Sequence, residues 1–305
     1  MSDDKHRVET FESHRAHLTG LAYRMLGSVS EAQDAVQEAY LRWHQVDRDR
    51  IGNARAFLAK IVTRICLDEM KSARARRETY VGPWLPEPVL DEAGVAVEAA
   101  SEYAHDLSVG LLLALERLSP LERAAFLLHD VFDVGFPEIA ELLERSEPTC
   151  RQLAARGRTH VRAARPRFPM PADGGLAIAR AFAAALQRGD ISALARVLAE
   201  DAVLHSDGGG KKIAALNVIV GRDRMLRLAA GIIRKYPEPT VVGVHITRIN
   251  GMPGFVTAFS DGSLQTTALE IERGSIAAIY VVRNPEKLRH LAATIPDERP
   301  SWDEG

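Results

Sequence analysis

The sequence predicts a multidomain protein in which two all-helical units are followed by an α+β domain. Apolar residues recur at helical spacing over the first half of the chain. Two segments rich in proline and glycine interrupt that pattern, and short runs of β-branched and aromatic residues appear near the carboxyl end. A length of 305 residues also exceeds that of most single domains.

The first helical unit is expected over residues 1–78, where apolar residues such as Leu18, Leu21 and Met25 recur every three or four positions. A linker is expected over residues 79–105. Its first part, TYVGPWLPEPVLDEAG, holds three prolines and two glycines in 16 residues, which rules out a continuous helix. The second helical unit is expected over residues 106–168 and ends at RPRFPMPADGG.

The third domain is expected over residues 174–292. Two helical stretches, from Leu176 to Arg188 and from Ile191 to Leu198, precede strand-like runs such as TVVGVHITRI and LQTTALEIE. Turn signals such as NGMPG and SDG separate these runs, and a longer helix, GRDRMLRLAAGIIRKY, comes before them. This mixture of helices and strands predicts an α+β fold.

Composition sets few limits on function, because a net charge of −2 can conceal local basic segments. The two cysteines, Cys66 and Cys150, are far apart in apolar helical patterns and are expected to be reduced core thiols. No apolar run is long enough to span a membrane, and the polar amino terminus does not resemble a signal peptide. We therefore expect a cytoplasmic protein without membrane contact.

A helix-turn-helix is predicted between Phe136 and Arg167. A short helix is followed by the turn ERSEP and by a basic second helix, and six arginines and no acid fall between Arg151 and Arg167. In such a motif the second helix enters the major groove, where arginine and glutamine recognise base edges. The candidate contacts are Thr149, Arg151, Gln152, Arg156, Arg158 and Arg162. A helical hairpin with a solvated arginine face is the alternative.

Two further charged faces occur in the first unit. A basic helix holds candidate phosphate contacts at Lys60, Arg64, Lys71, Arg74, Arg76 and Arg77. The preceding helix, SEAQDAVQEAYLRWH, carries Glu31, Asp34, Gln37 and Glu38 on the face opposite its apolar residues. Taken alone, an acidic stripe of this kind is typical of a solvated surface.

Three segments in this order resemble the extracytoplasmic-function (ECF) sigma factors of the sigma-70 family: EAQDAVQEAYLRWH, ARAFLAKIVTRICLDEMKSARARRE, and LSPLERAAFLLHDVFDVGFPEIAELLERSEPTCRQLAARGRTHVR. The resemblance implies that the first unit is sigma region 2 and the second is sigma region 4. It implies that the acidic stripe docks on core RNA polymerase, that the basic helix captures and melts the promoter −10 element, and that the helix-turn-helix reads the −35 element.

The sequence departs from the common pattern of this family at two places. Glu144 and Arg145 stand at the helix-turn-helix corner, where a glycine and an apolar residue are usual. Loss of a glycine at a position with positive φ costs about 1 kcal/mol. Arg64 stands where asparagine is common, so the −10 preference cannot be transferred from other members.

The third domain resembles the SnoaL-like cone-shaped fold, and the stretches YVGPWLPEP, DGGGK and NPEKL resemble the subgroup of ECF sigma factors with a fused SnoaL-like domain. The resemblance implies regulation in cis. We expect the linker to contribute to it, because WLPEP joins a large aromatic to a stiff extended backbone. The candidate regulatory residues are Trp84, Leu85, Pro86, Asp207, Gly208, Gly209, Gly210, Lys211, Asn284 and Pro285. The alternative is that Trp84 only covers local apolar surface.

A catalytic role has weaker support in the sequence. HSDGGGKK lacks the spacing of a phosphate-binding GxxxxGK[ST] loop and is expected to form a tight loop. SnoaL-like folds also serve as enzymes, with Asp201, His205, Asp207, His245 and Asp261 as candidate acids and bases here, but these residues form no diagnostic motif. His14 and His17 are expected to be a surface pair rather than a metal site. We expect no cofactor, no metal and no catalytic residue.

The predicted partners are core RNA polymerase and promoter DNA, with a small-molecule ligand of the third domain left open, and the free protein is expected to be a monomer. Two other functions stay open: a SnoaL-like cyclase or isomerase fused to a DNA-binding module, and a repressor that uses only the helix-turn-helix.

Overall fold

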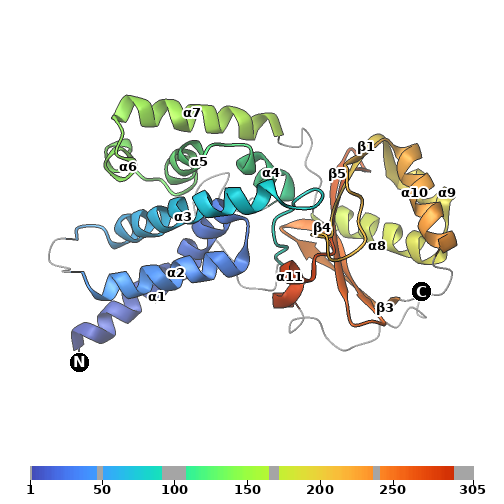
Figure 1. Cartoon of the computed structure of the whole chain (residues 1–305), viewed down its shortest axis with the longest axis horizontal. Helices are drawn as coiled ribbons and strands as arrows, with labels where there is room; N and C mark the ends of the chain where they lie inside the picture. Colours follow the sequence, from blue (N-terminus) through green and yellow to red (C-terminus); the bar gives the residue numbers. More distant parts are fainter. Residues whose placement is uncertain (1, 47–50, 91–107, 165–171, 236–240, 292–305) are drawn as a thin grey trace. The chain divides into compact units, whose positions relative to one another are not determined.

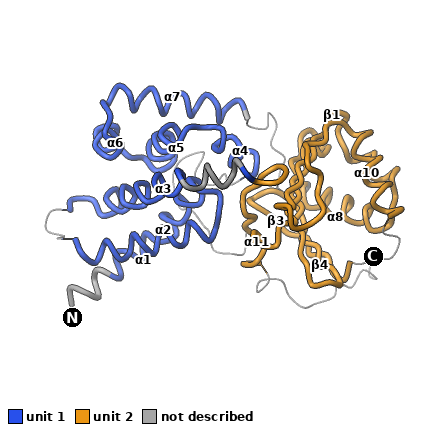
Figure 2. The backbone as a smooth tube through the Cα atoms, in the orientation of Figure 1, with its two compact units in different colours: residues 1–79, 94–165 blue, residues 80–93, 166–305 orange. Residues whose placement is uncertain are grey.

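The structure, a computed structural model, describes residues 2–46, 51–90, 108–164, 172–235 and 241–291, without the side chains of residues 2–7, 72–78, 164 and 172–174. It forms two compact units (Figure 2). Unit 1 comprises residues 1–79 and 94–165, and unit 2 comprises residues 80–93 and 166–305. The two predicted helical domains thus share one compact unit, and the linker stretch Tyr80–Ala93 belongs to the unit of the third domain.

The first part of unit 1 packs three helices: α1 (Ser2–Leu26), α2 (Val29–His44) and α3 (Ala54–Glu78) (Figure 1). The side chain of Ser28 caps α2 by accepting a hydrogen bond from the backbone N–H of Glu31, 3.2 Å away. Leu21, Trp43 and Leu58 are buried where the three helices meet. The apolar residues that recur at helical spacing in the sequence therefore form this core.

The second part of unit 1 contains α4 (Val109–Glu116), α5 (Pro120–Phe126), a π-helical turn η3 (Leu127–Val131), α6 (Phe136–Leu143) and α7 (Glu147–Ala164). Ser119 and Glu122 form a reciprocal capping box at the start of α5, with Pro120 in the first turn. Gly157 of α7 lies against Phe126, and a Cβ atom at this position would stand 2.7 Å from the Phe126 Cβ atom. Glycine therefore permits the close packing of α5 on α7.

A buried arginine joins the two parts of unit 1. The Nη1 atom of Arg123 in α5 donates hydrogen bonds to the carbonyl oxygen of Met25, 2.6 Å away, and to the Oε1 atom of Glu116, 2.7 Å away. Only 1% of the Arg123 surface is exposed. Burial lowers the pKa of Arg123 to about 9, so that the guanidinium is still charged at neutral pH and requires both partners.

The described residues of unit 2 form a six-stranded sheet in the order β2-β1-β6-β5-β4-β3. The strands are β1 (Leu198–Asp207), β2 (Ile219–Val220), β3 (Val241–Ile249), β4 (Met252–Phe259), β5 (Leu264–Glu272) and β6 (Ser275–Val282). Strands β3 to β6 form an antiparallel meander, whereas β1 pairs with β6 in parallel. Each strand-like run of the sequence is a strand in the structure.

Three helices, α8 (Ala172–Arg188), α9 (Ile191–Val197) and α10 (Arg222–Lys235), lie on one side of the sheet (Figure 1). Apolar side chains including Phe182, Met225 and Phe255 form a continuous core between these helices and the sheet. On the other side lies the short helix α11 (Pro285–Leu288), followed by the 3-10 turn η4 (Arg289–Leu291). This is the predicted α+β domain.

Within the described residues, no helix combines the length and apolar character that crossing a bilayer requires.

Candidate functional site

The helix-turn-helix is formed by α6 and α7. The residue at its corner, Glu144, adopts the left-handed conformation with φ 54° and ψ 46°. Ser146 caps α7 by accepting a hydrogen bond from the backbone N–H of Thr149, 3.4 Å away. Cys150, Ala154 and Val161 face the core of unit 1, whereas the opposite face of α7 exposes the predicted base-contacting residues Arg151, Gln152, Arg156 and Arg162.

Three arginines of α7 have carboxylate partners in unit 1: Arg158, Arg151 and, at the longer distance of 3.9 Å from Glu122, Arg156. Arg158 forms a bidentate ion pair with Asp130 of η3, with Nε–Oδ1 and Nη2–Oδ2 distances of 2.6 and 2.9 Å. Its side chain is 29% exposed, so that Arg158 serves the packing of α7 rather than standing free at the surface. Arg151 pairs with Glu147 at 2.5 Å and lies over the ring of Phe136.

The predicted basic face lies on α3, where Arg64 and Lys71 are exposed and Lys60 is half-buried. Lys60 pairs with Glu141 of α6 at 3.1 Å, and Arg64 pairs with Glu144 at 3.0 Å. Lys71 pairs within α3 with Asp68, 2.8 Å away. The side chains of the remaining predicted contacts, Arg74, Arg76 and Arg77, lie outside the described part of the chain.

The acidic stripe lies on the outer face of α2. Asp34, Gln37 and Glu38 are exposed, whereas Glu31 is half-buried at the capped start of the helix. The sequence reasoning missed Leu41, which is 51% exposed on the same face one turn beyond Gln37 and Glu38. The face therefore combines acidic groups with an exposed apolar side chain, as protein docking surfaces often do.

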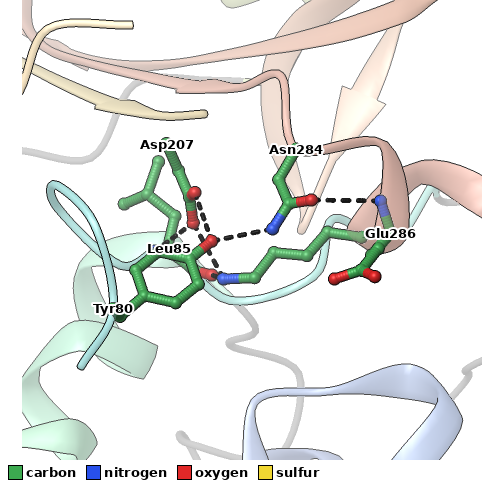
Figure 3. Close-up of polar contacts among 6 residues, drawn as sticks. Tyr80, Leu85, Asp207, Asn284 and Glu286 are labelled. Carbon is green, nitrogen blue, oxygen red and sulfur yellow. Dashed lines mark hydrogen bonds and ion pairs between the residues drawn. The ribbon is translucent and has the colours of Figure 1, made fainter. Parts of the chain in front are cut away.

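The third site lies in unit 2, where the linker stretch Tyr80–Leu90 contacts the α+β domain (Figure 3). Its centre is the carboxylate of Asp207, at the end of β1, which has no exposed surface. The Oδ1 atom accepts a hydrogen bond from the Tyr80 hydroxyl at 2.5 Å, and the Oδ2 atom accepts one from the Leu85 backbone N–H at 2.8 Å. One carboxylate thus holds two points of the linker.

Lys287 of α11 supplies the positive charge at this site. Its ammonium lies 2.8 Å from the Oδ2 atom of Asp207 and also donates to the carbonyl oxygen of Leu85. The same ammonium lies 4.3 Å from the ring centroid of Trp84 and 4.9 Å from that of Tyr80. A buried charge pair needs such additional partners, because removal from water costs several kcal/mol per ion.

Asn284 connects the linker to the start of α11. Its Nδ2 atom donates to the Tyr80 hydroxyl at 2.8 Å, and its Oδ1 atom caps α11 by accepting from the backbone N–H of Glu286 at 3.1 Å (Figure 3). Burial, with the hydrogen bond to Asp207, raises the pKa of Tyr80 above its usual value. The Tyr80 hydroxyl therefore stays protonated and can donate to Asp207.

The far end of the stretch is held through its main chain. The Oδ1 atom of Asn250 accepts from the N–H of Val89 at 3.2 Å, and the N–H of Asn250 donates to the Val89 carbonyl at 2.7 Å. The Nε2 atom of His290 lies 2.7 Å from the carbonyl oxygen of Pro88. Leu85, Pro86 and Pro88 are buried, so that the unit holds the whole length of WLPEP.

The glycine triplet Gly208–Gly210 forms the loop beside this site. Gly209 and Gly210 have φ angles of 58° and 70°, in the left-handed region that favours glycine. A Cβ atom on Gly209 would stand 2.3 Å from the Nδ2 atom of Asn284. The next residue, Lys211, forms an ion pair with Glu286. The glycines therefore allow the side chains of Asn284 and Tyr80 to lie directly against this loop. The triplet forms the tight loop that the sequence predicted.

The remaining candidate acids and bases are scattered in unit 2. Asp201 is exposed, and Asp261 pairs with Lys212 at 2.8 Å at the surface. The ring of His205 stacks on that of Tyr280, with centroids 5.3 Å apart, and His245 is half-buried on β3. The carboxylate of Asp207 accepts hydrogen bonds from Tyr80 and Leu85 of the linker. Within the described residues these groups do not converge on one cavity.

The expectation that His14 and His17 form a surface pair is wrong for His17. Only 8% of the His17 surface is exposed, its Nε2 atom accepts a hydrogen bond from the Nε atom of Arg55 at 3.2 Å, and its ring packs edge-on against Phe132. His17 lies on the inner face of α1, beside Leu18 and one turn before Leu21. The buried position of these two leucines could have been used to predict the burial of His17 from the sequence.

Comparisons with known proteins agree with this division. Family models match residues 10–76 as sigma-70 region 2, residues 108–161 as sigma-70 region 4, and residues 179–284 as a SnoaL-like domain. ECF RNA polymerase sigma factor SigJ of Mycobacterium tuberculosis is 37% identical over 292 residues, which cover 92% of each chain. A probable ECF RNA polymerase sigma factor of the same species, SigI, is 32% identical over 93% of this chain and 96% of its own.

The crystal structure of Mycobacterium tuberculosis SigJ matches with a TM-score of 0.73 and 34% sequence identity, over 92% of this chain and 98% of that chain. Helical regions 2 and 4 and the fused α+β domain therefore occur together in a relative of nearly the same length. The chain belongs to the ECF sigma factors of the sigma-70 family that carry a C-terminal SnoaL-like domain.

Proposed function

We propose that this sigma factor reads the −35 element through α7, melts and holds the −10 element through α3, and docks on core RNA polymerase through α2. The observation that carries the proposal is the outer face of α7, on which Arg151, Gln152, Arg156 and Arg162 are exposed to solvent. Side chains of these types make bidentate contacts with guanine and adenine in the major groove. The polymerase acts in the cytoplasm, where we place this protein.

Arg158 has a different role in this proposal. Because Asp130 holds its guanidinium through two hydrogen bonds, Arg158 orients α7 and leaves base contact to Arg156 and Gln152. Arg156→Ala should weaken promoter binding and reduce its salt dependence by about one phosphate contact, without a loss of stability. Arg158→Ala should lower the melting temperature of unit 1 as well.

The outer face of α2 is proposed to bind core polymerase. Leu41 would supply the apolar centre of that contact, and Asp34 and Glu38 would supply its charges. Leu41→Ser should weaken retention of core subunits in a pull-down, because the exposed side chain contributes little to the fold of the free protein. Failure of the wild-type chain to retain core polymerase would contradict this proposal and would favour a repressor.

Regulation in cis is proposed to act through the linker. Unit 2 holds Tyr80–Leu90, which lies between regions 2 and 4 in the sequence, by contacts at Asp207, Lys287 and Asn250. A bound linker constrains the separation and orientation that the two regions can adopt. Catalysis is not part of the proposal, since the candidate acids and bases of unit 2 are scattered among the described residues.

The experiment is in vitro transcription with core polymerase on a genomic promoter library, comparing the full chain with a chain that ends before residue 172. Removal of the α+β domain, which leaves the linker stretch Tyr80–Ala93 in place, should change promoter-dependent transcription while retention of core polymerase is preserved. Unchanged transcription would contradict regulation in cis, whereas the absence of promoter-dependent transcripts from both chains would contradict the proposed promoter contacts of α3 and α7.

A further inference from the structure

Two ion pairs within unit 1 connect the basic face of α3 to the acidic edge of α6. Lys60 pairs with Glu141 at 3.1 Å, and Arg64 pairs with Glu144 at 3.0 Å. The two cations are four residues apart on α3. Of the two carboxylates, Glu141 lies on α6 and Glu144 lies three residues later, at the left-handed cap that ends the helix. We call these four residues the α3–α6 clasp.

The same cations are the phosphate contacts of the proposed function. Carboxylates at hydrogen-bonding distance occupy the positions that DNA phosphates would take, because both groups present oxygen anions to the ammonium and the guanidinium. We propose that the clasp is an intramolecular competitor of DNA, in which Glu141 and Glu144 hold Lys60 and Arg64 until promoter DNA displaces them. This inference rests on the proposed role of α3 in DNA binding.

The geometry of Glu144 supports this assignment. Its backbone is left-handed, with φ 54°, which costs an L-residue about 1 kcal/mol relative to glycine. That conformation turns the chain at the corner of the helix-turn-helix, and the Glu144 side chain reaches Arg64 from there. Two of the three residues at which the sequence departs from the common family pattern, Glu144 and Arg64, are therefore partners of each other.

The strength of the clasp is suited to displacement. The side chains of Glu141 and Glu144 are 79% and 75% exposed, so that water and salt screen both pairs. A contact of this kind is weak enough for the phosphates of a nucleic acid to replace it, yet it delays or reduces binding of free protein to nonspecific DNA. Salt should open the clasp while it also weakens the DNA contacts.

The test measures binding of a fluorescein-labelled poly-dT strand to the full-length protein by fluorescence anisotropy, over a series of salt concentrations. The double variant Glu141→Gln/Glu144→Gln should bind about twofold to tenfold more tightly than the wild type at low salt. The difference should shrink as salt rises, because the clasp of the wild type is then already open. If Glu144→Gln disturbs the corner, Glu141→Gln alone should give a smaller increase of the same kind.

The matched control is Glu138→Gln, which removes the same charge from α6 at a position with no ion pair in the described part of the chain. It should change binding less than Glu141→Gln does. In a Lys60→Gln/Arg64→Gln background, the double variant should have no further effect, as a double-mutant cycle requires for coupled residues.

The outcomes separate the two proposals. If Lys60→Gln/Arg64→Gln leaves poly-dT binding unchanged, the proposed role of α3 in DNA binding is wrong. If that variant weakens binding, but Glu141→Gln/Glu144→Gln binds as the wild type does, or gains as much when Lys60 and Arg64 are absent, the clasp proposal is overturned and the role of α3 stands.

Discussion

At the scale of single residues, Asp207 is a connecting point of unit 2, because its fully buried side chain joins β1, α11 and the linker. Removal of its charge leaves the Lys287 ammonium buried without a counter-ion. The stretch DGGGK indicated this residue in the sequence. Its partner Lys287, which stands in NPEKL, was missed, because a lysine at a helix end is typical of solvent contact.

Asp207→Asn should lower the free energy of unfolding of unit 2 by about 3–5 kcal/mol, the cost of breaking a buried ion pair by removal of one partner. Denaturant unfolding of the full chain, followed through the tryptophan fluorescence that Trp84 contributes to, measures it. Asp261→Asn is the control, since its pair with Lys212 lies at the surface. Equal effects of the two substitutions would mean that the Asp207 cluster does not hold the unit together.

His17 should make the stability of unit 1 sensitive to mild acid. Burial and the neighbouring Arg55 lower the pKa of His17 to about 3, whereas an unfolded histidine titrates at about 6.5. Below pH 6.5 the unfolded chain therefore binds a proton that the folded chain does not, and the free energy of unfolding falls as the pH falls, by about 1–2 kcal/mol at about pH 5.

The measurement compares thermal or denaturant unfolding of the wild type and His17→Gln at neutral pH and at about pH 5. The variant is expected to lose less stability in acid than the wild type does. The same pH dependence in both proteins would show that other groups, and not His17, are responsible.

At the scale of elements, the packing of α7 on α5 depends on the absence of a side chain at Gly157. An alanine Cβ atom there would stand 2.7 Å from the Phe126 Cβ atom and 3.2 Å from the Glu122 carbonyl oxygen. The separation of the two helices would have to increase, and this would move the exposed arginines of α7 relative to the rest of the helix-turn-helix.

Gly157→Ala is therefore expected to destabilise unit 1 by about 1–3 kcal/mol, although alanine is the better helix former. Gly231→Ala in α10 is the matched control, because nothing lies within 4 Å of its Cβ position, and it should stabilise unit 2 by about 0.5–1 kcal/mol. Unfolding curves of both variants measure these changes. A stabilised Gly157→Ala would show that the α5–α7 contact relaxes without cost.

The order and type of the elements could be predicted from sequence because they depend on local periodicity. The alternation of Thr, Val and Ile predicted β3, and the breaker segments that begin at Thr79 and near Pro166 predicted where α3 and α7 end. Contacts between distant residues carry no such signal. The sequence indicated Lys60 as a candidate phosphate contact but gave no sign of its partner Glu141. It indicated Asn250 as a turn residue only, although Asn250 also holds Val89.

At the scale of the whole molecule, the position of the linker in the sequence differs from its position in the fold. Its residues lie between the two sigma regions in the chain, yet they belong to the compact unit of the SnoaL-like domain. The proline-rich composition predicted an extended segment, but composition could not tell which unit would hold it. The contacts of Leu85 with Asp207 and Lys287 hold the linker in unit 2.

Leu85→Asp should release the linker, because a carboxylate replaces a fully buried side chain beside the carboxylate of Asp207. Promoter-dependent transcription by the full chain is expected to change in the same direction as on removal of the α+β domain, with core polymerase still retained. Val242→Ser, at a side chain that is 55% exposed, is the control. Transcription equal to that of the wild type would argue against the linker as the regulatory element.

The distance along the chain between the linker and its partners also determines how long after the linker its partners are synthesised. Leu85 leaves the ribosome long before Lys287, which lies 202 residues later. At about 5–20 residues per second, roughly 10–40 seconds separate the two events. Regions 2 and 4 are complete for most of that interval, so each newly made molecule passes through a period in which its DNA-binding helices exist and the group that restrains its linker does not.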